Sequence, residues 1–297
     1  MSQAAESAQC VSDAIIDIAT LRSLWGAPSV RILDCRHDLA QPDLGWQQYR
    51  QGRIPGAVFA HLDRDLSGKK TGFNGRHPLP RPEELVARLR SWGIDTTSRV
   101  VAYDASQGCY AARAWWLLRW LGHANVAVLD GGWPAWIAAG CPTSQAEAPT
   151  STGSFEPRPA LAAVAPVETV AESSRNAGQA GAKLLIDARA PDRYEGRSET
   201  IDPVAGHIPG AINRFWKQNL SSDGRFKPPA QLRTEYETLL LDRTPQEVIV
   251  HCGSGVIACH DLLAMHLAGL QGAALYPGSW SEWIAEPSRP VRRGPAP

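Results

Sequence analysis

The sequence predicts an α/β protein made of two tandem copies of one domain, each a mainly parallel sheet flanked by helices. Two observations predict this class. Three segments of the first half recur in the same order in the second half, as in a duplicated fold. Short apolar runs also alternate with helical patterns in each half, which is the order of parallel strands joined by helices.

The repeated segments locate the two copies. They are VRILDCR at 30–36 with KLLIDAR at 183–189, GRIPGA at 52–57 with GHIPGA at 206–211, and LDGGWPAW at 129–136 with LYPGSWSEW at 275–283. A chain of 297 residues has the length of two ordinary domains. We expect an N-terminal domain at 1–142, a linker at 143–166 that is rich in Pro, Ser, Thr, Ala and Gly, and a C-terminal domain at 167–297.

Strand and helix patterns alternate within each copy. An apolar run precedes an amphipathic segment, and a second apolar run follows it. These segments are 99–103, about 111–121 and 126–129 in the first copy, and 247–250, about 256–268 and 273–276 in the second. This order predicts parallel sheets covered by helices.

The charges of the chain cancel, with 30 Lys and Arg against 30 Asp and Glu. No global field therefore attracts nucleic acid or an anionic membrane. The first residues carry acids and no basic region before an apolar run, so they do not resemble a signal peptide, and no apolar run reaches the ~18 residues of a membrane span. We expect a cytoplasmic protein without nucleic-acid or membrane partners. A monomer is expected because the duplicated fold buries an internal interface.

The six cysteines form no CxxC pair and no regular disulfide framework, which fits a reducing compartment. Cys252 and Cys259 lie near His251 and His260, but their spacing is not that of zinc ligands. We therefore expect no metal and no cofactor. Five cysteines are interpreted as structural, namely Cys10, Cys35, Cys109, Cys141 and Cys259.

One cysteine stands in a setting typical of catalysis. An apolar strand runs into Cys252, and the segment CGSGVIA at 252–258 leads into a helix. Its glycines allow a tight turn, so we expect backbone N–H groups, including those of Gly253, Gly255 and Val256, to point into one cup at the positive helix end. Such a cup activates a thiolate and stabilises an anionic persulfide or donor. The alternative is a buried structural cysteine at a strand end.

The repeat, the GHIPGA segments and the Cys252 loop resemble the tandem-domain rhodanese and 3-mercaptopyruvate sulfurtransferase family, from about residue 18 to residue 283. The loop is similar to the CGSGVTA loop of the mercaptopyruvate branch, with Ile257 in place of Thr, and differs from the CRKGVTA loop of the thiosulfate branch. The resemblance implies a catalytically silent first domain. Asp104 stands where the second copy has Cys252, and a carboxylate does not form a persulfide.

The resemblance also implies that the first domain lends an acid and a histidine to the site. The matching residues are Asp63 and His77, and Ser254 is expected to relay a proton with them. From the residues alone, His77 beside two prolines is more typical of a solvated loop, and Asp63 is nearly as typical of a helix cap or a surface position. Both interpretations stay open at this point.

The carboxylate of a sulfur-donating substrate is best bound by a planar side chain that donates two hydrogen bonds. Arg193 matches the first of two substrate arginines in the family that the chain resembles. A surface ion pair is the alternative for this residue. The second arginine is missing from its expected place at 199–205, and Arg197 is the candidate to replace it. This departure leaves the preferred donor open.

We therefore expect a sulfurtransferase that moves sulfane sulfur from 3-mercaptopyruvate or thiosulfate to a thiol, cyanide or thioredoxin-like acceptor through a Cys252 persulfide. A cysteine-dependent phosphatase is disfavoured, because its Cys-x5-Arg loop needs an arginine where this chain has Ala258. A non-enzymatic persulfide carrier or a regulatory rhodanese-like binding protein stays open, since it uses the same cysteine.

Overall fold

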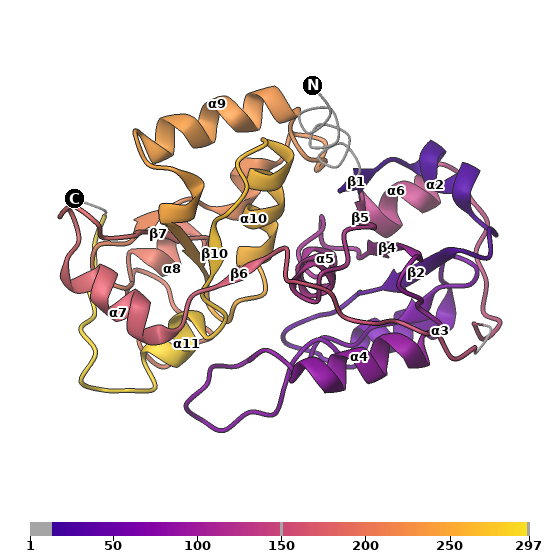
Figure 1. Ribbon diagram of the computed structural model, residues 1–297, viewed down its shortest axis with the longest axis horizontal. Coiled ribbons are helices and arrows are strands. Elements are labelled where there is room, and N and C mark those ends of the chain that lie inside the picture. Colours follow the sequence, from indigo (N-terminus) through magenta and orange to yellow (C-terminus); the bar gives the residue numbers. More distant parts are fainter. Residues whose placement is uncertain (1–13, 149–150, 296–297) are drawn as a thin grey trace. The chain divides into compact units, whose positions relative to one another are not determined.

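A computed structural model describes residues 14–148 and 151–295 (Figure 1). The chain divides into two compact units. Among the described residues, the first unit contains 14–68, 79–148, 151–161 and 222–225. The second unit contains 69–78, 162–221 and 226–295. Each unit has its own sheet and its own core.

The first unit is a five-stranded sheet with flanking helices (Figure 1). Its strands have the order β1-β5-β4-β2-β3, and all neighbouring pairs are parallel. The elements are β1 (Ile15–Ile16), α2 (Ile18–Leu24), β2 (Val30–Asp34), α3 (Leu44–Gln51), β3 (Val58–Phe59), α4 (Pro82–Ser91), β4 (Arg99–Tyr103), α5 (Ala111–Trp120), β5 (Val126–Leu129) and α6 (Gly132–Ala138).

The second unit repeats this topology. Its strands have the order β6-β10-β9-β7-β8, again with parallel neighbours. The elements are β6 (Ala163–Val164), α7 (Val167–Arg175), β7 (Leu184–Asp187), α8 (Pro191–Tyr194), β8 (Ile212–Asn213), the 3₁₀ helix η1 (Trp216–Asn219), α9 (Pro229–Leu240), the 3₁₀ helix η2 (Pro245–Glu247), β9 (Val248–His251), α10 (Ala258–Leu267), β10 (Ala274–Leu275) and α11 (Ser279–Trp283). The predicted fold class, two mainly parallel α/β units, is confirmed.

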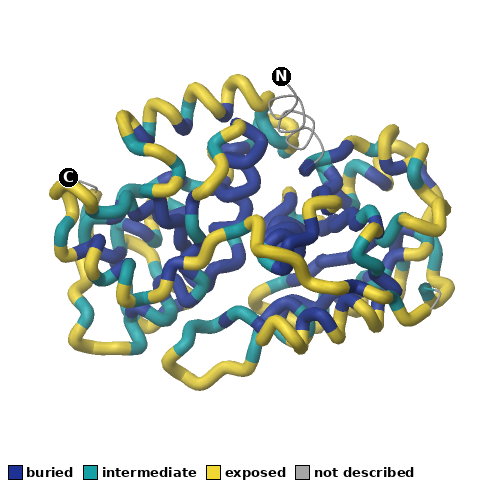
Figure 2. The backbone as a smooth tube through the Cα atoms, in the orientation of Figure 1, coloured by how far each residue is buried: buried dark blue, intermediate teal, exposed yellow. Residues whose placement is uncertain are grey.

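Helices α5 and α10 are the most deeply buried helices that the figures display (Figure 2). Every residue of α10 is buried, because α10 lies against β9 on one side and α9 packs on it from another. The start of α10, and the loop that leads into it, are therefore held in place by the core. None of the described helices combines the length and the apolar character that a bilayer crossing needs.

In both repeats, the arginine of the Asp-x-Arg segment binds the first glycine of the glycine-containing segment, so the two segments recur together. In the second unit, Arg189 donates from Nε and Nη2 to the carboxylate of Asp187 at 2.6–3.0 Å, and Nη2 also donates to the carbonyl of Gly206 at 2.8 Å. A buried guanidinium thus ties the carboxyl end of β7 to the turn that precedes β8. The first unit has the same arrangement, made by Asp34, Arg36 and Gly52.

The division of the chain differs from the predicted boundaries in two respects. Most of the predicted linker, up to residue 161, packs with the first unit; Phe155, for example, is 1% exposed and its carbonyl accepts a hydrogen bond from Arg90 at 2.9 Å. The segments 69–78 and 222–225 each pack with the unit of the other repeat. Anchoring contacts, rather than composition, decide where these segments belong.

Candidate active site

The Cys252 loop joins the end of β9 to the start of α10. The helix begins at Ala258, two residues later than the sequence pattern suggested, so the loop spans residues 253–257. Cys252 is 2% exposed. The loop stands at the carboxyl ends of the parallel strands and at the amino end of a buried helix, where ligands of α/β folds commonly bind.

Ser279 holds the backbone of Cys252 from the start of α11. Its Oγ accepts the N–H of Cys252 at 3.1 Å and donates to the carbonyl of Tyr276 at 2.9 Å. Ser279 has a φ of +54°, a region that costs a residue with a side chain about 1–3 kcal/mol. The equivalent residue of the first repeat is Gly132, with a φ of +53°. A serine in a glycine conformation beside the predicted nucleophile was not predicted, although the aligned repeat contained the signal.

Glycines let other groups approach the loop closely. Gly255 has a φ of +74°, and a Cβ there would lie 2.2 Å from the carbonyl oxygen of Pro277, so only glycine fits. A Cβ on Gly253 would lie 2.9 Å from Nη2 of Arg76 and 3.5 Å from Nη2 of Arg193. Two guanidinium groups therefore lie beside the residue that follows the predicted nucleophile.

The structure brings together two of the predicted catalytic residues besides Cys252. Nδ1 of His77 and Oγ of Ser254 are 2.8 Å apart, and these residues are 4% and 6% exposed. His77 comes from the segment 69–78, which packs with the second unit. The interpretation of His77 as a solvated loop residue is therefore wrong, and the histidine is a buried partner of the loop serine.

Arg76 is a site residue that was not predicted. Its backbone N–H donates to Oγ of Ser281 at 3.0 Å, and its guanidinium forms an ion pair with Asp202. Burial lowers the pKa of Arg76, while a charged Cys252 opposes that shift and the nearby Arg193 adds to it. The only signal in the sequence is its place directly before His77.

Arg193 lies in the same cluster and is mostly buried. Its guanidinium bonds Glu199 at 2.9–3.1 Å and Asp202 at 3.0 Å. Asp202 thus bridges the two arginines beside Gly253. Arg197, in contrast, has a side chain that is 60% exposed and pairs with Asp192 and Glu195. The structure does not support Arg197 as the second substrate arginine, whereas the guanidinium of Arg76 lies beside that of Arg193 at Gly253.

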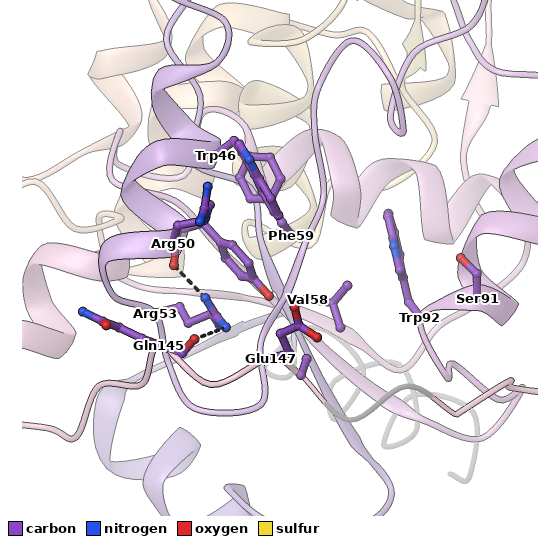
Figure 3. Close-up of a pocket in the computed structure, with 11 residues that line it drawn as sticks. Trp46, Arg50, Arg53, Val58, Phe59, Ser91, Trp92, Gln145 and Glu147 are labelled. Atoms are coloured by element: carbon purple, nitrogen blue, oxygen red, sulfur yellow. Dashed lines mark hydrogen bonds between the residues drawn. The ribbon is translucent and has the colours of Figure 1, made fainter.

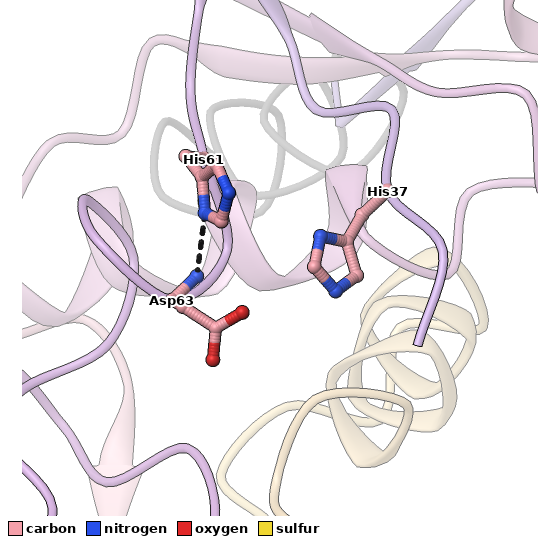
Figure 4. Close-up of side chains that lie close together, drawn as sticks. All are labelled: His37, His61 and Asp63. Carbon is pink, nitrogen blue, oxygen red and sulfur yellow. Dashed lines mark hydrogen bonds between the residues drawn. The ribbon is translucent and has the colours of Figure 1, made fainter. Parts of the chain in front are cut away.

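Asp63 belongs to the first unit. Its backbone N–H donates to Nδ1 of His61 at 3.1 Å, and its side chain lies near His37 and His61 (Figure 4). Its participation in the Cys252 site stays a prediction. Cys259 is fully buried and its thiol lies 3.4 Å from the carbonyl of Gly255, which fits a structural cysteine.

The matching loop of the first unit is filled by its own side chain. Asp104 is 1% exposed, and its carboxylate accepts four backbone N–H groups at 2.7–2.9 Å. The donors are those of Ser106, Gly108, Tyr110 and Ala111. A loop between a parallel strand and a buried helix in this fold thus forms a binding site for one negatively charged group.

A second concavity lies in the first unit (Figure 3). It has a volume of about 680 Å³, is lined by four aromatic side chains among polar and charged ones, and contains none of the predicted site residues. Arg53 at the wall of this pocket donates hydrogen bonds to the backbone carbonyls of Tyr49 at 2.9 Å and Gln145 at 2.8 Å. The bond from Arg53 to Gln145 anchors the segment after α6 at this pocket.

The sequence matches a model of the rhodanese-like domain twice, over residues 17–139 and 169–286. A probable 3-mercaptopyruvate sulfurtransferase of Pseudomonas aeruginosa is 48% identical over 269 residues, which cover 90% of this chain and 93% of that protein. A putative thiosulfate sulfurtransferase of Mycobacterium tuberculosis is 43% identical over 277 residues, which cover 90% of this chain and 92% of that protein. Similar proteins are thus named for either donor.

Solved structures share the architecture. The crystal structure of SseA from Escherichia coli, described as a 3-mercaptopyruvate sulfotransferase, matches with a TM-score of 0.77 at 29% identity and covers 90% of this chain and 98% of that one. The 3-mercaptopyruvate sulfurtransferase from Leishmania major matches with a TM-score of 0.76 at 29% identity and covers 91% of this chain and 74% of that one.

Proposed function

This chain belongs to the rhodanese family, with two rhodanese-like domains, and from that membership we propose that it is a sulfurtransferase that carries sulfane sulfur as a persulfide on Cys252. Its relatives at 48% and 43% identity are named 3-mercaptopyruvate and thiosulfate sulfurtransferases. The proposal concerns the reaction that both names share.

The loop around Asp104 is the observation that carries the proposal. In the first unit, this loop accommodates a carboxylate with four amide hydrogen bonds. Cys252 occupies the same position in the second unit, after a parallel strand and before a buried helix. Its thiolate, and the persulfide that forms from it, take the place of the carboxylate. Backbone amides then stabilise the negative charge without a metal or an organic cofactor.

The donor is bound by guanidinium groups beside the loop. Arg76 and Arg193 both lie next to Gly253, and a carboxylate accepts hydrogen bonds from such groups with high geometric specificity. Their bridging partner, Asp202, fixes both side chains in place. A second guanidinium, together with a loop that has no basic residue of its own, favours 3-mercaptopyruvate as the preferred donor over thiosulfate.

The first half-reaction forms one bond and breaks one. The Cys252 thiolate forms an S–S bond to the thiol sulfur of 3-mercaptopyruvate as the C–S bond breaks. The electron pair of the broken bond goes to the methylene carbon, which takes a proton and leaves as pyruvate. His77 and Ser254, 2.8 Å apart, are placed to supply that proton, and Asp63 is proposed as an acid that assists them.

The second half-reaction regenerates the thiolate. A thiol, cyanide or a thioredoxin-like protein attacks the outer sulfur of the persulfide and carries it away. Donor and acceptor therefore react with the same atom in turn, which gives ping-pong kinetics. The chain is proposed to act as a monomer on small donors, with no nucleic-acid or membrane partner.

The test is the intact mass of the protein after brief incubation with 3-mercaptopyruvate or thiosulfate under non-reducing conditions. The wild type is expected to gain the mass of one sulfur atom, faster with 3-mercaptopyruvate, and Cys252→Ser to gain none. Cys259→Ser is the matched control and is expected to gain the sulfur.

Turnover with a small thiol acceptor completes the test. A protein that gains no sulfur from either donor is not a sulfurtransferase of this class, and the non-enzymatic carrier becomes the better account. Sulfur that Cys252→Ser still gains would assign the persulfide to another cysteine. A faster reaction with thiosulfate would refute only the donor preference.

A further inference from the structure

Two buried acids pair with the arginines Arg76 and Arg193 beside Gly253. The side chains of Glu199 and Asp202 are both 2% exposed. Asp202 bonds both guanidinium groups, and Glu199 bonds that of Arg193. We propose that Asp202 is a specificity-determining residue, which makes this site select a singly charged carboxylate donor over a doubly charged one. This inference rests on the proposed sulfur-transfer function and specifies the charge of its donor.

The charges of these four side chains cancel. The two guanidinium groups are positive, and the two carboxylates that bond them are negative. Arg189 lies 3.5 Å from Glu199 but is bonded to Asp187 at 2.6 Å, so this neighbouring pair adds no net charge. The thiolate that the proposed reaction requires at Cys252 adds a negative charge. The acids and arginines together therefore provide no net attraction for an anionic donor.

Hydrogen-bond geometry, rather than net charge, is then the basis on which the arginines recognise a donor. A Cβ on Gly253 would lie 2.9 Å from Nη2 of Arg76 and 3.6 Å from Nη1 of Arg193, so both groups present N–H donors to the same place. A carboxylate accepts from two such groups at once, because its two oxygens lie in one plane and share a single charge. Thiosulfate has no carboxylate and brings a second charge, which a neutral cluster does not offset.

Removing the charge of Asp202 separates the electrostatic effect of this acid from its effect on the position of the arginines. The electrostatic gain is twice as large for a dianion as for a monoanion, because the energy scales with the charge of the donor. At a separation of a few Å, one unit of charge changes an affinity by roughly tenfold or more. Asparagine keeps the size of the side chain and one oxygen acceptor. A changed ratio of affinities thus indicates charge, whereas an equal loss for both donors indicates position.

The experiment measures the binding of 3-mercaptopyruvate and of thiosulfate to the full-length protein by isothermal titration calorimetry. The Cys252→Ser background removes the predicted nucleophile, so each donor stays intact. We expect this protein to bind 3-mercaptopyruvate more tightly than thiosulfate. Asp202→Asn is expected to shift the ratio of the two dissociation constants toward thiosulfate by at least about tenfold. Glu199→Gln removes the other negative charge of the cluster and is expected to shift the ratio in the same direction.

Two variants are the controls. Asp202→Glu keeps the charge and is expected to keep the ratio. Asp192→Asn removes the same charge next to Arg193 in the chain, but from a side chain that is 64% exposed and screened by water, and is expected to leave the ratio unchanged.

Three results would each overturn the proposal. They are an unchanged ratio or an equal loss for both donors in Asp202→Asn, the same shift in Asp192→Asn, and binding of neither donor. The measurement involves no turnover. A protein that transfers no sulfur would therefore refute the proposed function and still show whether Asp202 sets the preferred charge of a bound anion.

Discussion

Replacing Asp104 by alanine tests whether the silent unit keeps its loop in shape by filling it with its own anion. The carboxylate accepts four backbone N–H groups, and three of them, those of Gly108, Tyr110 and Ala111, are buried. Alanine removes every acceptor and leaves the donors in place. We expect the loop and the first turn of α5 to lose their fixed geometry.

The magnitude follows from the three buried donors. Each costs about 1–3 kcal/mol when it is left without a partner, so the sum is about 3 kcal/mol at its lower limit. Two effects keep the loss near that limit. Water enters the vacated space, and the cost of burying the carboxylate, which raises the pKa of Asp104, disappears. A loss of about 3 kcal/mol corresponds to roughly hundredfold faster amide exchange in the first unit.

Hydrogen exchange followed by mass spectrometry resolves the two units. Peptides from α5 are expected to exchange roughly a hundredfold faster in Asp104→Ala, and peptides from α10 at the wild-type rate. Cys252→Ala, the same substitution site in the other repeat, is the matched control and is expected to leave α5 unchanged. Wild-type exchange of α5 in Asp104→Ala would refute the idea that the carboxylate holds the loop.

Three further predictions concern the second unit. Gly255→Ala places a Cβ against a backbone carbonyl and is expected to lower kcat/KM at least about a hundredfold. Gly269→Ala is the control, because Gly269 has a similar φ of +75° and a Cβ there meets no backbone atom. It is expected to cost about 1 kcal/mol of stability and to leave kcat/KM unchanged. Burial raises the pKa of Asp261 to about 7, so the folded state favours the protonated form of this residue. The stability that the protonated form contributes to the folded state is complete below about pH 4 and is lost as the pH rises through about 7. The free energy of unfolding in urea is therefore expected to fall across this pH range in the wild type and not in Asp261→Asn. The same pH dependence in both proteins would contradict this role of Asp261. Arg76→Lys is expected to raise KM for 3-mercaptopyruvate about tenfold, and Arg197→Lys to leave it unchanged; the reverse order would restore Arg197 as the substrate arginine.

The sequence was sufficient for those features that depend on neighbours in the chain. The duplication, the parallel order of the strands and the turn around Cys252 all follow from local patterns, because apolar runs, glycines and a helix start are visible in a single stretch. The contact of Ser254 with His77 joins residues 177 positions apart, and only the family resemblance suggested it.

Residues whose role comes from distant parts of the chain were harder to identify. Arg76 meets Ser281 across 205 positions, and no periodicity in the sequence links them. Arg197 is the candidate for the second substrate arginine because it lies close to Arg193 in the chain. Its side chain is exposed, however, and pairs with Asp192 and Glu195. Ser279 was overlooked for another reason, since its role comes from a backbone conformation that a serine seldom adopts.

The exchange of short segments between the two units limits how this gene could be divided. A fragment that begins at the second repeat lacks the segment 69–78, and with it the partner of Ser254 and one of the two guanidinium groups beside Gly253. A fragment that ends with the first repeat lacks the segment 222–225. A duplicated copy that has Asp104 in place of the loop cysteine would ordinarily be dispensable and free to decay. Here each repeat contains a short segment that packs with the unit of the other repeat, so we expect that neither half folds as a self-sufficient module.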